Sequence, residues 1–109
     1  MAGFKNIEKG KVFSLLDLID YKTHRVISLT LCDSESLRIV LFSFDKDEAI
    51  TEEQTQNAEQ FTLLEGKMEV VIEGKKFMLE ENDSIIINPD EEHSLLALTP
   101  CKMLQTSLK

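Results

Sequence analysis

The sequence is short of basic residues, of prolines and glycines, and of long apolar runs. Its 12 lysines and arginines are outnumbered by 20 aspartates and glutamates, which gives a net charge of −8. This charge argues against nucleic acids and anionic membranes as partners, because both are bound through clustered basic side chains. No apolar stretch approaches the roughly 20 residues that span a bilayer, and the N-terminal residues lack a signal-peptide pattern. We therefore expect a cytoplasmic protein.

Cysteine is also scarce, and no linker-like segment divides the chain. Cys32 and Cys101 are the two cysteines, and they form no Cys-x-x-Cys pair. A chain of 109 residues can bury a core without disulfides, so we expect both thiols to be reduced and buried, as is usual in the cytoplasm. The sequence has no repeat, no low-complexity tract and no run rich in proline, glycine or serine. These absences favour one domain that spans residues 1–109.

Short polar clusters alternate along the chain with segments rich in β-branched and aromatic residues. Eight such segments predict strands, at residues 26–31, 37–44, 61–64, 68–72, 77–79, 84–87, 94–98 and 103–108. No segment of helical length separates them, as a parallel sheet would require, so the spacing favours an all-β antiparallel sandwich or barrel. Residues 12–19 fit either a strand or a short helix.

The predicted strand at residues 37–44 is apolar on both faces. Ile39 and Leu41 lie on one face, and Phe42 and Phe44 lie on the other. Such a strand needs cover on both sides. The core covers one side, and we expect a second subunit to cover the other, which predicts a homodimer. The N-terminal segment, about residues 1–25, is expected to pack on the barrel or on that partner.

Two stretches carry a recognisable motif pattern. Residues 59–66 begin with Glu59 and end with Gly66, and residues 82–93 run from Asn82 to His93. Together with the residues around them, 47–97, they resemble the cupin superfamily, in particular its small single-domain members. In that family the first motif ends with a glutamate, six residues and a glycine, and the second motif contains a histidine at the position of His93. The resemblance implies an antiparallel double-stranded β-helix, the jelly-roll barrel.

The sequence departs most from the cupin pattern where two histidines are expected. The positions of the family's His-x-His pair fall on Glu53, Gln54 and Thr55, or one residue earlier, on 52–54. Metal-binding cupins hold a divalent ion with those two histidines, the glutamate and the second-motif histidine. The resemblance therefore implies a reduced ligand set, Glu59 and His93 with Glu53 or Glu52, for zinc, manganese, iron or nickel. A solvated loop is the alternative interpretation of residues 51–57.

Three family glycines are replaced by residues that suit the same turns. Asp47, Asn82 and Asp90 stand at these positions. The glycines of the family serve backbone conformations with positive φ, and Asn and Asp tolerate these better than other non-glycine residues do. We therefore expect the turns to be kept.

A pocket is predicted around the glutamate and the histidine of the two motifs. Strand alternation places Glu59 on the same face as Phe61 and Leu63, towards an apolar interior. A buried carboxyl group must be paired, protonated or bound to a metal. We predict that Glu59, Phe61, His93 and Thr55 form a ligand pocket. Without a metal, Glu59 and His93 would face each other as an acid–base couple.

Three functions fit the resemblance. The first is a barrel protein that binds a small molecule in its interior, with or without a divalent metal. The alternative is a metal-dependent enzyme acting on a small organic substrate, of the oxygenase, isomerase or decarboxylase type that the family contains. The third is a dimeric scaffold without a ligand. Because jelly-roll barrels host many chemistries, the fold alone does not choose among them.

Overall fold

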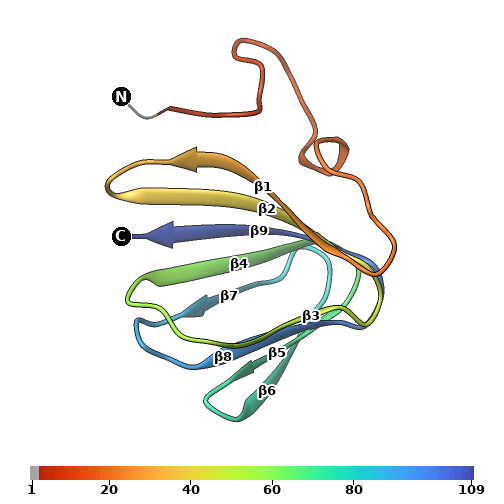
Figure 1. Ribbon diagram of the computed structural model, residues 1–109, viewed down its shortest axis with the longest axis vertical. Coiled ribbons are helices and arrows are strands. Elements are labelled where there is room, and N and C mark those ends of the chain that lie inside the picture. Colours follow the sequence, from red (N-terminus) through yellow and green to blue (C-terminus); the bar gives the residue numbers. More distant parts are fainter. Residues whose placement is uncertain (1–2) are drawn as a thin grey trace.

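The computed structural model describes residues 3–109, in which a short 3-10 helix precedes nine strands (Figure 1). The elements are η1 (Leu15–Asp17), β1 (Val26–Asp33), β2 (Leu37–Phe44), β3 (Ala49–Glu53), β4 (Ala58–Glu65), β5 (Met68–Ile72), β6 (Lys75–Leu79), β7 (Ser84–Ile87), β8 (His93–Ala97) and β9 (Cys101–Leu108). One sheet has the order β1-β2-β9-β4-β7, the other has the order β3-β8-β5-β6, and their strands pair antiparallel. The predicted all-β jelly-roll barrel is confirmed.

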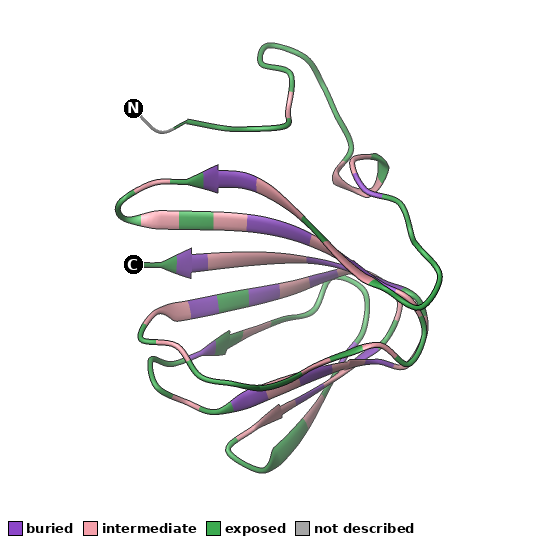
Figure 2. Cartoon of the chain, in the orientation of Figure 1, coloured by how far each residue is buried: buried purple, intermediate pink, exposed green. Residues whose placement is uncertain are grey.

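The core lies between the two sheets, where Figure 2 shows buried segments along the strands of both. Phe44 and Phe61 from the five-stranded sheet pack with Met68 and Leu95 from the four-stranded sheet, and all four are at most 2% exposed. Both cysteines are buried and free, as predicted. No helix in residues 3–109 is long and apolar enough to cross a membrane.

A second apolar cluster lies on the outer face of the five-stranded sheet. Leu41 of β2 and Leu31 of β1 are buried there against Ile19, and Leu15 and Leu18 pack around them. The outer face of β2 is therefore covered by residues 3–22 of the same chain, which we call the strap and which crosses outside this sheet in Figure 1. The expectation that a second subunit covers this face was therefore wrong, because the strap covers it. The homodimer itself stays a prediction.

Polar contacts hold the strap on the sheet. The buried Lys102 of β9 donates a hydrogen bond from Nζ to the Leu16 carbonyl at 2.6 Å, and Nζ lies 5.0 Å from the centroid of the Tyr21 ring. The Tyr21 hydroxyl in turn donates to the carboxylate of Glu65. A buried ammonium group is costly unless it is hydrogen-bonded, so these contacts favour one position of the strap.

Residues 12–19 were predicted to form either a strand or a short helix, and they contain the short helix η1. Ser14 stands at its N-cap in an extended conformation, and its side chain makes no capping hydrogen bond. The Ser14 carbonyl instead accepts a hydrogen bond from the Asp17 amide at 3.1 Å.

One strand lies where the sequence pattern predicts a polar loop. β3 (Ala49–Glu53) is mostly exposed, because it forms an edge of the four-stranded sheet. Edge strands carry charged residues that prevent association with other chains, so they lack a clear apolar alternation. β4, β6 and β9 also begin two or three residues before their predicted starts. Nine strands in residues 3–109 therefore replace the predicted eight.

The turns at the replaced glycines keep the expected backbone conformation. Asp47, Asn82 and Asp90 have φ angles of 69°, 72° and 65°. Gly66, by contrast, has a φ of 95°, and a Cβ atom there would lie 2.3 Å from the Pro100 carbonyl oxygen. Only a glycine satisfies both the backbone conformation and the close approach at this position.

Gly66→Ala should therefore lower the free energy of unfolding by about 2 kcal/mol or more, because the new methyl group must displace backbone atoms. Asn82→Gly is the matched control, since it changes a residue with positive φ without adding an atom, and its effect should stay below about 1 kcal/mol. Urea denaturation of both variants measures the difference. Equal losses in the two variants would contradict this account of Gly66.

Burial, followed by the hydrogen bond to Glu65, raises the pKa of Tyr21 above its usual value. A raised pKa in the folded state means that folding favours the protonated phenol. The stability gained from Tyr21 is therefore present below about pH 10, the pKa of the unfolded state, and is lost as the pH rises further.

Tyr21 is the only tyrosine in the chain, so the absorbance of the phenolate reports on this side chain alone. We expect the phenol to ionise at a higher pH in the folded protein than in denaturant. The free energy of unfolding should fall above about pH 10, and less steeply in Tyr21→Phe. The same titration midpoint in folded and unfolded protein would show that the strap contact is not formed.

Candidate functional site

Three titratable side chains from three strands meet inside the barrel. His93 of β8 lies between two carboxylates: its Nε2 is 3.7 Å from Glu59 Oε1 on β4 and 4.0 Å from Glu53 Oε2 on β3. His93 and Glu59 are 2% and 5% exposed, whereas the side chain of Glu53 is 50% exposed. The group therefore links the two facing sheets and is open on the side of Glu53.

The histidine has one satisfied nitrogen and one unsatisfied nitrogen. His93 Nδ1 donates a hydrogen bond to the Glu91 carbonyl at 3.1 Å, since a carbonyl oxygen can only accept. Its Nε2 is buried and has no hydrogen-bond partner among residues 3–109. The Phe61 ring supports the imidazole from the core, with 5.6 Å between ring centroids. The ring is thus held so that Nε2 points at the two carboxylates.

Hydrogen bonds from β9 orient the carboxylate of Glu59. Its Oε2 accepts from Gln105 Nε2 and from Ser107 Oγ, both at 2.9 Å. Glu59 and Ser107 are direct cross-strand partners, so the contact follows from the register of the sheet. This leaves Oε1 as the oxygen nearest to His93. Gln105 and Ser107 were not among the predicted site residues, although they share the inward face of β9 with the buried Met103.

A backbone irregularity brings Glu53 to the site. The pairing of β3 with β8 shifts by one residue between Ile50 and Glu53, and this shift places Glu53 opposite His93. In a regular strand Glu52 would occupy that place. Glu52 instead takes a φ of 50°, a conformation that a glutamate rarely adopts. Bulges of this kind often redirect a side chain beside a functional site, and here the bulge selects Glu53 from the two predicted candidates.

A cleft of about 480 Å³ opens over this group. Of the predicted pocket residues, Glu59 and Thr55 line it. His93 is buried behind the two carboxylates and does not line the cleft, and Phe61 lies in the core against the imidazole. The Thr55 hydroxyl is already hydrogen-bonded to the backbone of Asn57 at 3.1 Å. The lining residues are Arg38, Phe42, Ile50, Glu52, Glu53, Gln54, Thr55, Glu59 and Gln105.

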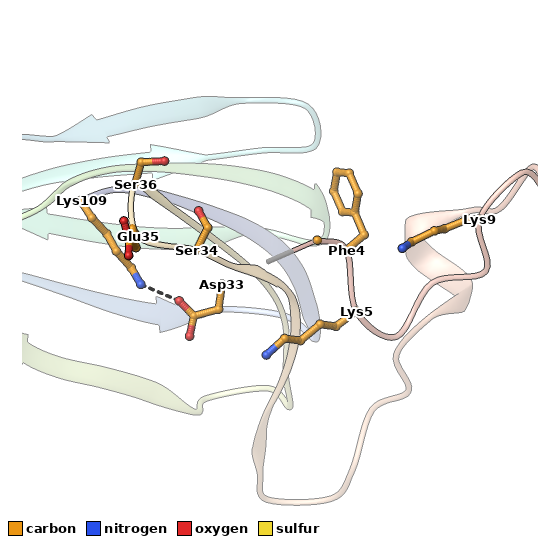
Figure 3. Close-up of a pocket in the computed structure, with 9 residues that line it drawn as sticks. Phe4, Lys5, Lys9, Asp33, Ser34, Glu35, Ser36 and Lys109 are labelled. Carbon is orange, nitrogen blue, oxygen red and sulfur yellow. Dashed lines mark hydrogen bonds and ion pairs between the residues drawn. The ribbon is translucent and has the colours of Figure 1, made fainter. Parts of the chain in front are cut away.

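A larger hollow, of about 1080 Å³, lies between the strap and the β1–β2 hairpin (Figure 3). Lys5, Lys9 and Lys109 line it, and all three are exposed. None of its lining residues is buried, and its carboxylate Asp33 is paired with Lys109 at 2.5 Å. The candidate site is therefore the smaller cleft, because the buried carboxyl group of Glu59 lines it together with Glu53.

The predicted metal ligands are neighbours, but they do not form a complete coordination site. In the described part of the chain, no three His, Cys, Asp or Glu side chains are placed to hold a metal ion. The donor types do suit zinc, manganese or iron. A histidine whose other nitrogen donates to a carbonyl is also typical of metal ligands. The metal set Glu59, His93 and Glu53 stays a prediction.

The arrangement has a clear chemical consequence. When His93 Nε2 carries no proton, three acceptors converge: this nitrogen and one oxygen each from Glu53 and Glu59. Acceptors that face each other without a donor are destabilised, and burial increases the cost. A proton, a metal ion or a ligand with hydrogen-bond donors would relieve this cost. The site is therefore built to receive a donor or a cation.

Glu59→Gln should stabilise the unliganded protein, because the new amide can donate to His93 Nε2 while its oxygen still accepts from Ser107. We expect a gain of about 1 kcal/mol, or roughly 5 °C in the thermal midpoint. Glu53→Gln is the matched control, and its half-exposed side chain should give a smaller change. A loss of about 3 kcal/mol in Glu59→Gln would instead indicate a closed buried ion pair.

Comparisons with known proteins agree with this geometry. The family model described as "Cupin domain" matches residues 40–106. A conserved protein of unknown function from Streptococcus pyogenes has a TM-score of 0.95 and 28% identity, covering 100% of this chain and 96% of that one. A cupin superfamily protein from Desulfitobacterium hafniense has a TM-score of 0.93 and 26% identity, covering 97% of both chains.

A third solved structure is a Cupin 2 conserved barrel domain protein from Leptotrichia buccalis. It has a TM-score of 0.92 and 27% identity, and the match covers 98% of this chain and 51% of that one. No curated protein matches the sequence.

Proposed function

Since this chain belongs to the cupin family, we propose that it binds a small molecule in the barrel, at the centre formed by Glu59 and His93. This chain lacks the two histidines of the usual cupin metal site, but it keeps the glutamate, Glu59, and the second-motif histidine, His93. The cleft of about 480 Å³ lies within the range of about 300–1,000 Å³ that is typical of ligand pockets.

The observation that carries this proposal is the unpartnered His93 Nε2. A buried polar atom without a hydrogen bond costs about 1–3 kcal/mol, and its neighbours Glu53 and Glu59 do not come within hydrogen-bond distance. A side chain that is 98% buried yet unsatisfied, next to two carboxylates that line a cleft, is explained by a ligand that enters between them and completes its hydrogen bonding.

The lining of the cleft indicates what such a ligand offers. Its polar centre consists of acceptors, so the ligand should present hydroxyl or ammonium donors to Glu59, Glu53 and His93. Phe42 and Ile50 add apolar surface to the wall. A small organic molecule with donors at one end and some carbon framework fits both features.

A divalent ion is the second candidate, and the donor set of one imidazole and two carboxylates favours it. Glu59, His93 and Glu53 would hold the ion. Once bound, it would act as a Lewis acid on an oxygen of the substrate, which is the basis for the alternative of a metal-dependent enzyme.

Thermal denaturation with and without added compounds tests the proposal. Zn²⁺, Mn²⁺ and a panel of small amines, alcohols and acids are added to the wild type, Glu59→Gln and His93→Gln, and each shift is measured from the variant's own baseline. Glu69→Gln, on the outer face of β5, is the matched control for the loss of one negative charge. At 100 times the dissociation constant a ligand stabilises by about 2.7 kcal/mol.

We expect at least one organic compound to raise the midpoint of the wild type and of Glu69→Gln, but not of the two site variants. Shifts produced by the metals alone, with the same dependence on Glu59 and His93, would support the second candidate instead. If every shift survived both site substitutions, the proposed centre would be wrong.

A further inference from the structure

We propose that the ligand of this cleft is a small zwitterion: a primary amine that also carries a carboxylate. Its ammonium group would bind at the Glu59–His93 centre, and its carboxylate would bind Arg38. This inference rests on the proposed function and adds a ligand class to it.

The ammonium end matches the acceptors in both number and charge. A primary ammonium group has three N–H donors and no acceptor. The carboxylates of Glu59 and Glu53 line the cleft, and His93 Nε2 is buried behind them, 3.7 Å from Glu59 Oε1 and 4.0 Å from Glu53 Oε2. Because two of these acceptors are carboxylates, a cationic donor gains more than a neutral hydroxyl would, and hydrogen bonds between charged groups are the stronger kind.

The register of the five-stranded sheet places Arg38 at a suitable distance from this centre. Arg38 on β2 is the cross-strand partner of Ser107 on β9, and Ser107 is the partner of Glu59 on β4. The three residues form one row across neighbouring strands, so the backbones of Arg38 and Glu59 lie two strand spacings apart, about 10 Å. Both side chains line the same cleft.

Arg38 is exposed, and within residues 3–109 no carboxylate holds it in an ion pair. Its cross-strand neighbour Asp33 could neutralise it, but Asp33 is paired with Lys109 at 2.5 Å (Figure 3). The hydrogen bond from Lys109 is the main cause that holds the pKa of Asp33 below its usual value. Among residues 3–109, Arg38 takes part in no ion pair and no side-chain hydrogen bond. A guanidinium group binds a carboxylate through two parallel hydrogen bonds.

The two ends together narrow the ligand class. A metal ion or a simple amine would satisfy the acceptors but would make no contact with Arg38, which would stay hydrated. A simple carboxylic acid would bind Arg38 but would be repelled by Glu53 and Glu59. Only a molecule with both charges, separated by a short carbon chain, uses the whole cleft, and the carbon chain would pass the apolar side chains of Phe42 and Ile50.

Isothermal titration calorimetry with matched compounds tests this inference. Glycine, γ-aminobutyrate and ε-aminocaproate vary the distance between the two charges, while butylamine and butyrate each lack one of them. The proteins are the wild type, Arg38→Gln and Glu59→Gln. Arg25→Gln serves as the control, because Arg25 is the other arginine of the chain, is exposed and does not line the cleft.

We expect one of the three zwitterions to bind the wild type at least about fivefold more tightly than butylamine, as a charge-assisted contact predicts. Arg38→Gln should remove that advantage without weakening the binding of butylamine, since it removes a positive charge from the cleft. Arg25→Gln should bind like the wild type. Glu59→Gln should weaken all amines, and butyrate should bind none of the proteins.

Equal affinities for butylamine and the zwitterions, unchanged by Arg38→Gln, would overturn the inference and leave the proposed function standing. Absence of any amine binding, with Zn²⁺ or Mn²⁺ binding that depends on His93, would also overturn it and would favour the metal. If the thermal shifts described above showed no dependence on Glu59 or His93, the proposed function itself would fall.

Discussion

A buried histidine nitrogen that finds no hydrogen-bond partner in residues 3–109 is the constraint around which this barrel is organised. His93 Nδ1 is fixed by the Glu91 carbonyl, and the core packs against the ring, so Nε2 cannot turn away to find water. Hydrogen bonds from β9 hold Glu59 opposite, and the bulge in β3 adds Glu53. The unpartnered nitrogen and the positive φ of Glu52 are costs, and together with the favourable contacts they maintain an acceptor-rich centre beside a cleft. Proteins keep such costs where a function requires them.

Much of the fold could be predicted because it depends on local patterns. The positive φ angles at the turns follow from the placement of Asp47, Asn82 and Asp90. The two apolar faces of β2 correctly indicated that both faces of this strand are packed against other residues. That the strap packs on the outer face of β2 could not be predicted, because the strap is irregular and its sequence has no periodic pattern of apolar residues. β3 was missed for a related reason: an exposed edge strand has the composition of a loop.

The site was predictable where it coincides with a motif and unpredictable where it depends on register. Glu59 and His93 follow from the family pattern, whereas a single-residue shift in β3 decides between Glu52 and Glu53. Gln105 could have been found, because a polar residue on the inward face of β9 beside Met103 needs a buried partner. Arg38 could not, since its place beside Ser107 and Glu59 depends on the pairing of strands distant in sequence.

The protonation of the His93 ring tests the central claim most directly, and ¹⁵N NMR of the imidazole measures it. In mildly alkaline buffer without ligand, the account predicts a proton on Nδ1 and none on Nε2, with the Nε2 resonance shifting when a ligand binds. Two protonated nitrogens, with Nε2 unchanged by any ligand, would contradict it. The histidine and Glu59 would then form a closed ion pair that serves the fold alone.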